Sequence, residues 1–316
     1  MLRLDRVSKV YKIGTFGGKE LHAVSDVSFE VQDGEVVSLI GESGSGKTTI
    51  GKMILRLISI SSGTISLDGV NISTLEGGAL KEYYRKVQGV FQDPFSSYNP
   101  IFKADRVFGM IRDEFFPEMK GREWETNVAS TLKAVGLNPD DVLNKFPHQL
   151  SGGQLQRFLI ARALLLDIQF LVADEIISML DASRRIDVLN LLADLKSRGL
   201  SILFITHDLS LGFYISERAV LLYRGCVVEM GSTERVYYNP LHPYTRMIMA
   251  CVPRLDEKWE EVEVDLKAKH SEFTGGCVYY ERCPVADKDG ACATDRPALI
   301  EAEPDHFVAC SRCAEG

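Results

Sequence analysis

One short motif limits the folds open to this chain more than any other feature. Residues 41–48 read GESGSGKT and fit the phosphate-binding pattern G-x-x-x-x-G-K-[ST]. An apolar stretch, residues 36–40, precedes the motif, and a helical pattern, residues 47–58, follows it. Such a loop needs a strand before it and a helix after it, because loop amides and the helix N-terminus together hold the phosphate. The residues expected around a phosphate are Gly41, Ser43, Gly44, Ser45, Gly46, Lys47, Thr48 and Thr49.

Two later apolar runs also end in polar residues. One run is followed by Asp174 and Glu175, and the next by His207. The runs and the helical patterns around them are residues 154–166, 168–173, 184–197 and 200–206. This alternation predicts an α/β fold with a parallel sheet that binds ligands at the carboxyl ends of its strands. We expect Thr48 and Asp174 to bind Mg²⁺, Lys47 to reach the phosphates and Glu175 to act as general base.

Three other segments have patterns of their own. Residues 27–31 alternate apolar and polar side chains, which predicts a half-buried antiparallel strand. Residues 94–150 interrupt the strand–helix alternation with an aromatic, helix-like stretch, which predicts an inserted helical subdomain. Residues 218–230 predict a hairpin that turns at Arg224-Gly225.

A second phosphate-binding pattern lies at residues 150–154, which read LSGGQ before an arginine-rich helical segment. A serine hydroxyl and glycine amides at a helix N-terminus suit a phosphate. With these residues the chain resembles the ABC-transporter ATPase family over residues 1–235. The resemblance implies a P-loop ABC-type ATPase core with a parallel sheet, an N-terminal antiparallel β-subdomain and a helical subdomain at about residues 94–155. In the family the signature loop binds ATP held by a partner chain, which here implies Ser151, Gly152, Gly153 and Gln154.

The resemblance assigns roles to three further residues. Tyr11 corresponds to the aromatic that stacks on adenine, although a strand tyrosine in the core would also fit the pattern. Gln92 corresponds to the glutamine that contacts Mg²⁺ and the attacking water, with a polar strand cap as the alternative. His207 corresponds to the histidine that contacts the γ-phosphate, with a structural histidine as the alternative.

The chain departs from the family after the catalytic acid. Ile176 stands where proline is usual, and Met179 stands in the dimer-contact loop, residues 178–181, where alanine is usual. Neither change removes a chemical group from the expected site. The resemblance therefore leaves open the rigidity of this loop and the rate of hydrolysis that depends on it.

Composition narrows the class of protein. The net charge is −8, which argues against a broad nucleic-acid-binding face. No apolar run approaches the roughly 18–20 residues that span a bilayer, and the first residues show no signal segment. We therefore expect a soluble cytoplasmic chain that reaches the membrane only through partners. A single cassette of this kind is typical of importers, and a non-transport regulatory ABC ATPase is the alternative from another class.

Five of the seven cysteines cluster between Cys277 and Cys313. In a reducing compartment such a cluster indicates a metal or iron–sulfur site more than disulfides. Residues 239–245, NPLHPYT, and the GC-x5-CP pattern that begins at Gly276 resemble the peptide/nickel importer family. Relatives hold a [4Fe–4S] cluster on four cysteines, which implies Cys277, Cys283, Cys292 and Cys310. A zinc site or plain buried thiols are the alternatives, and Cys313 is an extra thiol.

Together these patterns predict an ABC ATPase domain over residues 1–235 and a C-terminal extension over residues 236–316. The expected activity is ATP hydrolysis that powers an importer of oligopeptides or dipeptides, with oligosaccharides (β-glucosides) or nickel as alternative cargo. The expected partners are a homologous ATPase subunit in a heterodimer, two integral membrane permeases and an extracytoplasmic solute-binding protein. The expected location is the cytoplasmic face of the membrane, as a peripheral subunit.

Overall fold

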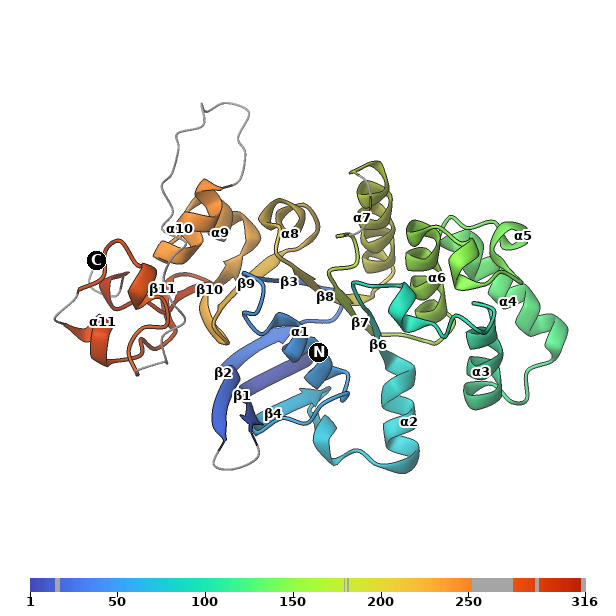
Figure 1. The fold of residues 1–316 in the computed structure, drawn as a ribbon, viewed down its shortest axis with the longest axis horizontal. Coiled ribbons are helices and arrows are strands. Elements are labelled where there is room, and N and C mark those ends of the chain that lie inside the picture. Colours follow the sequence, from blue (N-terminus) through green and yellow to red (C-terminus); the bar gives the residue numbers. More distant parts are fainter. Residues whose placement is uncertain (15–17, 179, 181, 252–274, 288–289, 314–316) are drawn as a thin grey trace. The chain divides into compact units, whose positions relative to one another are not determined.

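The computed structural model describes residues 1–316 except 15–17, 179, 181, 252–274, 288–289 and 314–316 (Figure 1). The chain forms two compact units. Unit 1 comprises residues 1–30, 36–69 and 204–316, and unit 2 comprises residues 31–35 and 70–203. Met179 of the expected dimer-contact loop lies outside the described residues.

The N-terminal part of unit 1 is an antiparallel sheet, as predicted. Its order is β2-β1-β4, with bounds β1 (Leu2–Ile13), β2 (Lys19–Val31) and β4 (Ser62–Leu67). Leu2 of β1 lies opposite Leu67 of β4, and the register shifts between Asp5 and Ser8. Arg6, in this shift, has a φ of 47°. The strand continues past this register shift, so Tyr11 lies inside β1.

The strands of the second sheet that belong wholly to unit 1 have the order β11-β12-β10-β9-β3. They are β3 (Val36–Ile40), β9 (Arg218–Tyr223), β10 (Cys226–Ser232), β11 (Ile300–Glu303) and β12 (His306–Val308). β3 pairs with β9 in parallel, and all five residues of β3 are buried. β9 and β10 form the predicted antiparallel hairpin. β12 pairs antiparallel with β10, so the C-terminal segment extends the sheet that begins at the phosphate-binding motif.

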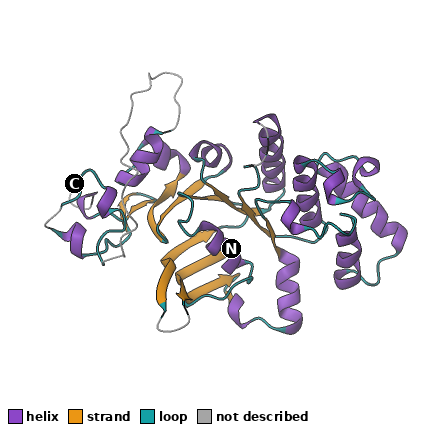
Figure 2. Ribbon diagram, viewed as in Figure 1, coloured by secondary structure: helices purple, strands orange, loops and turns teal. Residues whose placement is uncertain are grey.

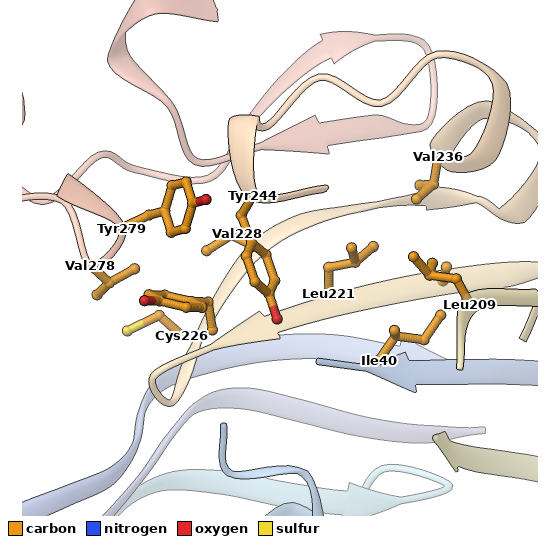
Figure 3. Close-up of a cluster of buried hydrophobic side chains, with 11 residues drawn as sticks. Ile40, Leu209, Leu221, Cys226, Val228, Val236, Tyr244, Val278 and Tyr279 are labelled. Carbon is orange, nitrogen blue, oxygen red and sulfur yellow. The ribbon is translucent and has the colours of Figure 1, made fainter. Parts of the chain in front are cut away.

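Helices of unit 1 follow and cover these strands. They are α1 (Lys47–Ile54), α8 (Leu209–Ile215), α9 (Thr233–Tyr238), α10 (Pro243–Ala250) and α11 (Ala291–Thr294). A buried cluster joins the C-terminal segment to the strands (Figure 3). In it Tyr244 and Tyr279 pack with Ile40, Leu221 and Val228. The segment after residue 236 therefore shares a hydrophobic core with the strand before the phosphate-binding motif.

Unit 2 combines a short parallel pair of strands with a set of helices. Its strands are β5 (Val70–Asn71), β6 (Val87–Val90) and β7 (Phe170–Asp174), and β8 (Ser201–Thr206) runs from this unit into unit 1. β6 and β7 pair in parallel, with Val87 opposite Phe170. Its helices are α2 (Gly77–Lys86), α3 (Arg106–Phe115), α4 (Gly121–Ala134), α5 (Pro139–Val142), α6 (Gly152–Leu164) and α7 (Ala182–Ser197).

Between β6 and β7 the described chain contains helices and loops but no strand, in agreement with the expected helical insertion (Figure 2). The parallel pairs β3–β9 and β6–β7 confirm the α/β class. Within the described residues, no helix has both the length and the apolar character needed to cross a membrane.

Candidate functional site

The phosphate-binding loop connects β3 to α1 in unit 1. The N-cap of α1 is Gly46, which has a φ of 104° and offers no side chain to cap the helix. A Cβ on Gly41 would lie 2.2 Å from the carbonyl oxygen of Leu222, so this position accepts only glycine without a shift of the backbone. The first amides of α1 thus face a ligand site without a side-chain competitor.

Lys47 is held inside the loop. Its side chain is 4% exposed, and its Nζ donates to the carbonyl oxygens of Gly41 (2.7 Å) and Glu42 (2.9 Å). The nearby Ser45 hydroxyl is buried and has no hydrogen-bond partner among the described residues. Thr48 is exposed at the start of the helix. An ammonium, an unsatisfied hydroxyl and a helix N-terminus together form a site suited to an anion.

Tyr11 and His207 lie in the same unit. The Tyr11 ring is half-buried, and the ammonium of Lys9 lies 5.0 Å from its centroid. Tyr11 is therefore not part of the buried core, and its ring is accessible for stacking on a base. His207 is exposed just after β8, next to Asp208, whose carboxylate caps α8 by accepting from the Ser210 amide (2.9 Å).

The acidic pair lies at the carboxyl end of β7 in unit 2. Asp174 is 3% exposed at the end of a fully buried strand, and Glu175 follows with a φ of 49°. The amide and hydroxyl of Ser178 both donate to the Glu175 carbonyl, at 3.1 and 2.9 Å. Ile176 is 1% exposed. Non-glycine residues adopt such a φ at a cost of about 1–3 kcal/mol, so buried neighbours must hold the turn at Glu175.

Gln92 lies exposed in the loop after β6. The next residue shapes this loop, because the Asp93 carboxylate accepts from the Phe95 amide at 2.9 Å and the Ser96 hydroxyl donates to the Asp93 carbonyl at 2.8 Å. Phe95 is 46% exposed and Ile101 75% exposed. The aromatic residues between β6 and β7 therefore differ in their surroundings. Phe95 is exposed to solvent, whereas Phe116 packs on Trp124 at a centroid distance of 5.6 Å.

The signature residues start helix α6 in unit 2. The Ser151 hydroxyl accepts from the Gln154 amide (3.2 Å), and the Gln154 side-chain oxygen accepts from the Ser151 amide (2.9 Å), which makes a capping box. The hydroxyl hydrogen of Ser151 and the amides of Gly152 and Gly153 are not used by this box. These donors are the ones that a phosphate would need.

A buried arginine connects α6 to the strand that leads to Gln92. Nη2 of Arg162 donates to the Gly89 carbonyl oxygen in β6, at 2.9 Å. Burial lowers the pKa of this guanidinium, and burial raises the pKa of the neighbouring Tyr98 hydroxyl above its usual value. A hydrogen bond within unit 2 therefore connects the signature helix to β6, the strand that precedes Gln92.

The candidate residues fall into two sets. The phosphate-binding loop, Tyr11 and His207 belong to unit 1; Gln92, residues 151–154, Asp174 and Glu175 belong to unit 2. Each set contains one helix N-terminus with glycine amides. The unit 1 set holds the lysine, and the unit 2 set holds the acidic residues.

Four of the C-terminal cysteines line one pocket in unit 1. They are Cys277, Cys283, Cys292 and Cys310, and His242 and Tyr279 line it with them. Burial raises the pKa of the Cys277 and Cys283 thiols, and the neighbouring thiols raise it further. Cys313 is not among the lining residues, and its thiol lies 3.5 Å from the Leu241 carbonyl oxygen.

No group of three or more His, Cys, Asp or Glu side chains in the described part of the chain is placed to hold a metal ion. The pocket therefore does not have the close ligand set of a zinc site. The four lining cysteines are the ones that the sequence names as ligands of a cluster, and that assignment stays a prediction.

Sequence reasoning missed two residues that contact the phosphate-binding loop. Arg282 forms an ion pair with the Glu42 carboxylate at 2.9 Å, and the Tyr244 hydroxyl accepts from the Glu42 amide at 3.0 Å. One signal was present: an acidic residue inside a loop that binds anions needs a nearby cation. The pattern G-x-x-x-x-G-K-[ST] leaves the Glu42 position unspecified, so the motif alone does not predict a cation beside Glu42.

Two family models match separate parts of the chain. Residues 24–178 match the model described as "ABC transporter", and residues 228–292 match the model described as "Oligopeptide/dipeptide transporter, C-terminal region". The first match includes the phosphate-binding loop, the signature residues and the acidic pair. The second includes Tyr244, Arg282 and three of the pocket cysteines.

Similar proteins cover almost all of the chain. A putative peptide import ATP-binding protein of Brucella ovis is 42% identical over 296 residues, which is 92% of each chain. The oligopeptide transport ATP-binding protein OppF of Streptococcus mutans is 38% identical over 309 residues, 98% of this chain and 94% of that one. Among solved structures, the ATP-binding cassette MJ0796, a dimer in a post-hydrolysis state bound to ADP and phosphate, has a TM-score of 0.67 and 30% identity. It covers 74% of this chain and 99% of its own length.

Proposed function

We propose, from the premise that this chain belongs to the ABC transporter family of ATP-binding proteins, that it powers the import of oligopeptides. The chain is an ATPase subunit of the oligopeptide transporter type, with the cassette and the C-terminal region in one polypeptide. The observation that carries the cargo assignment is the C-terminal match to the oligopeptide/dipeptide transporter model. The relatives quoted above are named for peptides, which favours peptides over oligosaccharides or nickel.

Hydrolysis would use the residues that the sequence names for the nucleotide site. The loop amides and Lys47 bind the β- and γ-phosphates, while Tyr11 stacks on the base. The Glu175 carboxylate accepts a proton from the attacking water as its oxygen bonds to the γ-phosphorus and the bond to the ADP oxygen breaks. Gln92 orients that water, and His207 donates to a γ-phosphate oxygen.

We propose that Thr48, Asp174 and Gln92 would supply hydroxyl, carboxylate and amide oxygens to a magnesium ion, because hard oxygen ligands suit this ion. When bound, it would neutralise negative charge on the β- and γ-phosphates. The buried position of Asp174 at the end of β7 supports this role.

A second ATPase chain would complete each site. The free donors of Ser151, Gly152 and Gly153, with Gln154, are proposed to bind the γ-phosphate of ATP held by the partner chain. The dimeric state of MJ0796 with ADP and phosphate supports this arrangement by similarity. We propose a heterodimer with a homologous ATPase.

Membrane partners would receive the mechanical output. We propose two integral membrane permeases and an extracytoplasmic solute-binding protein, with this chain as a peripheral subunit on the cytoplasmic face. The exposed Phe95 and Ile101, close to Gln92 in sequence, supply apolar surface for a permease. We also propose that residues 1–235 act as the ATPase domain, with the helical subdomain at about 94–155, and residues 236–316 as an extension.

The thiol pocket is proposed to hold a structural [4Fe–4S] cluster. Protein purified without oxygen would then be brown and contain about four irons per chain. Tetrahedral zinc without iron would reject this assignment. A Cys283→Ser variant should lose the visible absorption band, whereas Cys251→Ser, at an exposed cysteine outside the pocket, should keep it.

The proposed function is tested by transport in reconstituted vesicles. The chain is co-expressed with its neighbouring permeases, second ATPase and binding protein, and uptake of a labelled tetrapeptide is compared with uptake of a labelled β-glucoside. Peptide uptake that requires ATP and stops with Lys47→Ala supports the proposal. Uptake of the glucoside alone, or failure to copurify with any polytopic membrane protein, contradicts it.

A further inference from the structure

The C-terminal region reaches back to the phosphate-binding loop through one arginine. Nη1 of Arg282 lies 3.0 Å from Oε1 and 2.9 Å from Oε2 of Glu42. The arginine side chain is 14% exposed, and the glutamate side chain 42%. The guanidinium also lies 5.9 Å from the ring centroids of Tyr223 and Tyr279. Aromatic packing thus holds Arg282 in the orientation that meets Glu42.

A tyrosine of the same region holds the backbone of Glu42. The Tyr244 hydroxyl accepts a hydrogen bond from the Glu42 amide at 3.0 Å, and Tyr244 is fully buried. The centroid of its ring lies 4.7 Å from that of Tyr223. It lies 5.5 Å from the centroid of Tyr279, whose ring Figure 3 shows beside Tyr244. Because Tyr244 is part of a rigid core, its hydroxyl fixes the position of the loop backbone.

Glu42 also contacts the lysine that the phosphates require. Its carbonyl oxygen accepts from Nζ of Lys47 at 2.9 Å and from the Ser45 amide at 3.1 Å. The amide, the carbonyl and the carboxylate of Glu42 are therefore all engaged. Two of these three groups, the amide and the carboxylate, are contacted by side chains of the C-terminal region. A shift of Glu42 would move the acceptor that places the Lys47 ammonium.

We propose that Arg282 and Tyr244 are positioning residues for ATP binding, and that both act through Glu42 of the phosphate-binding loop. This inference rests on the proposed ATPase function. The C-terminal region then contributes to the nucleotide site itself, although neither residue belongs to the cassette motifs.

Electrostatics supports a role beyond packing. A carboxylate in a loop that binds a triphosphate repels the ligand, and the repulsion increases in a partly buried site because the effective dielectric constant is lower. The Arg282 guanidinium neutralises this carboxylate by a charge-assisted hydrogen bond. Removal of Arg282 alone leaves the negative charge of Glu42 in the loop, whereas removal of both charges does not.

The test measures binding of Mg-ATP to the full chain by calorimetric titration, together with the melting temperature. Arg282→Ala should raise the Kd about tenfold, and Arg282→Lys should restore most of the affinity. Glu42→Gln should bind at least as tightly as the wild type, and Glu42→Gln/Arg282→Ala should stay within about twofold of Glu42→Gln. In the assembled complex, KM for ATP should rise with Arg282→Ala while kcat changes less than about twofold.

Arg224→Ala is the matched control. Arg224 forms an ion pair with Glu281 in the same region at 3.3 Å and lies 5.7 Å from the Tyr223 ring centroid, whereas Arg282 forms its ion pair with Glu42. This variant should keep the wild-type Kd. If Arg282→Ala does not fold, Tyr244→Phe carries the test, because it removes one oxygen atom from an otherwise intact core. It should raise the Kd about threefold.

The possible failures are distinguishable. A wild-type chain that does not bind Mg-ATP contradicts the proposed function. A wild-type chain that binds, with Arg282→Ala and Tyr244→Phe both within experimental error of it, overturns the present inference alone. The inference is also overturned if the double variant binds as weakly as Arg282→Ala, because Arg282 then does not act through Glu42.

Discussion

The two glycine-rich helix starts of this chain serve similar chemistry but are stabilised in different ways. Helix α6 stabilises its own start, since Ser151 and Gln154 form a capping box within four residues. Helix α1 starts at a glycine without a side-chain cap, and the loop before it is held by Tyr244 and Arg282, far along the chain. The signature loop of this chain is therefore stabilised by residues adjacent in sequence, whereas its phosphate-binding loop is stabilised by contacts with residues far along the chain.

The largest expected effect is the loss of ATPase activity when either glycine-rich loop is changed, and Mg-ATP binding by the isolated chain tells the two loops apart. Lys47→Ala and Ser151→Arg should each lower ATPase activity of the assembled complex by about 100-fold or more. In the isolated chain, Lys47→Ala should abolish Mg-ATP binding, while Ser151→Arg should leave it unchanged because that loop acts on the partner's nucleotide. Loss of Mg-ATP binding by the isolated Ser151→Arg chain would contradict the proposed composite site.

Alanine at one glycine of each loop should change the free energy of unfolding by different amounts. Gly41→Ala should lower the free energy of unfolding by about 2–4 kcal/mol, because its Cβ would meet the Leu222 carbonyl oxygen at 2.2 Å. Gly152→Ala should be neutral or slightly stabilising, because no described atom lies within 4 Å of its Cβ and alanine favours helices. Urea denaturation of both variants checks this, and equal destabilisation would contradict the difference between the loops.

Acid should weaken the tertiary support of the first loop. Burial lowers the pKa of His242 to about 4, against a partial increase from the Glu229 carboxylate. Between pH 6.5 and 4 the unfolded chain therefore binds a proton that the folded chain does not, so stability falls as pH falls. From pH 7 to 5 the loss is roughly 2 kcal/mol for this residue.

The Nδ1 atom of His242 accepts a hydrogen bond from the Tyr244 amide at 3.0 Å. The variant His242→Asn keeps a side-chain acceptor for this amide but has no imidazole to titrate. Urea unfolding at pH 7 and pH 5 should therefore show a smaller pH dependence in this variant. His148→Asn, at an exposed histidine in unit 2, is the control and should leave the dependence unchanged. A wild-type pH dependence in His242→Asn would refute the assignment.

The smallest expected effect concerns the self-capped helix. Ser151→Ala removes the acceptor of the Gln154 amide and should cost about 1 kcal/mol of unfolding free energy. Ser151→Thr should retain most of it. If the alanine variant is as stable as the wild type in chemical denaturation, the cap is not what holds this helix start.

Local patterns predicted β3, β7, β8, the hairpin and both glycine-rich loops, because the residues that determine the burial of β3 and β7 and the turn at Arg224-Gly225 are adjacent in sequence. The antiparallel addition of β12 to β10 was not predictable in this way, since three residues at the end of the chain carry no periodicity to read. The contacts of Glu42 were missed for the same physical reason. They join positions whose side chains meet only after the tyrosine core has formed.

The pair of Glu42 and Arg282 also has a consequence for the order of events during synthesis. The two residues are 240 positions apart, and a ribosome adds about 5–20 residues per second, so the loop is made roughly 10–50 seconds before its counter-cation. An unfinished or truncated polypeptide would carry an unneutralised acidic loop and compete poorly for nucleotide. The loop would then gain its full affinity for nucleotide only after residue 282 has been made and folded.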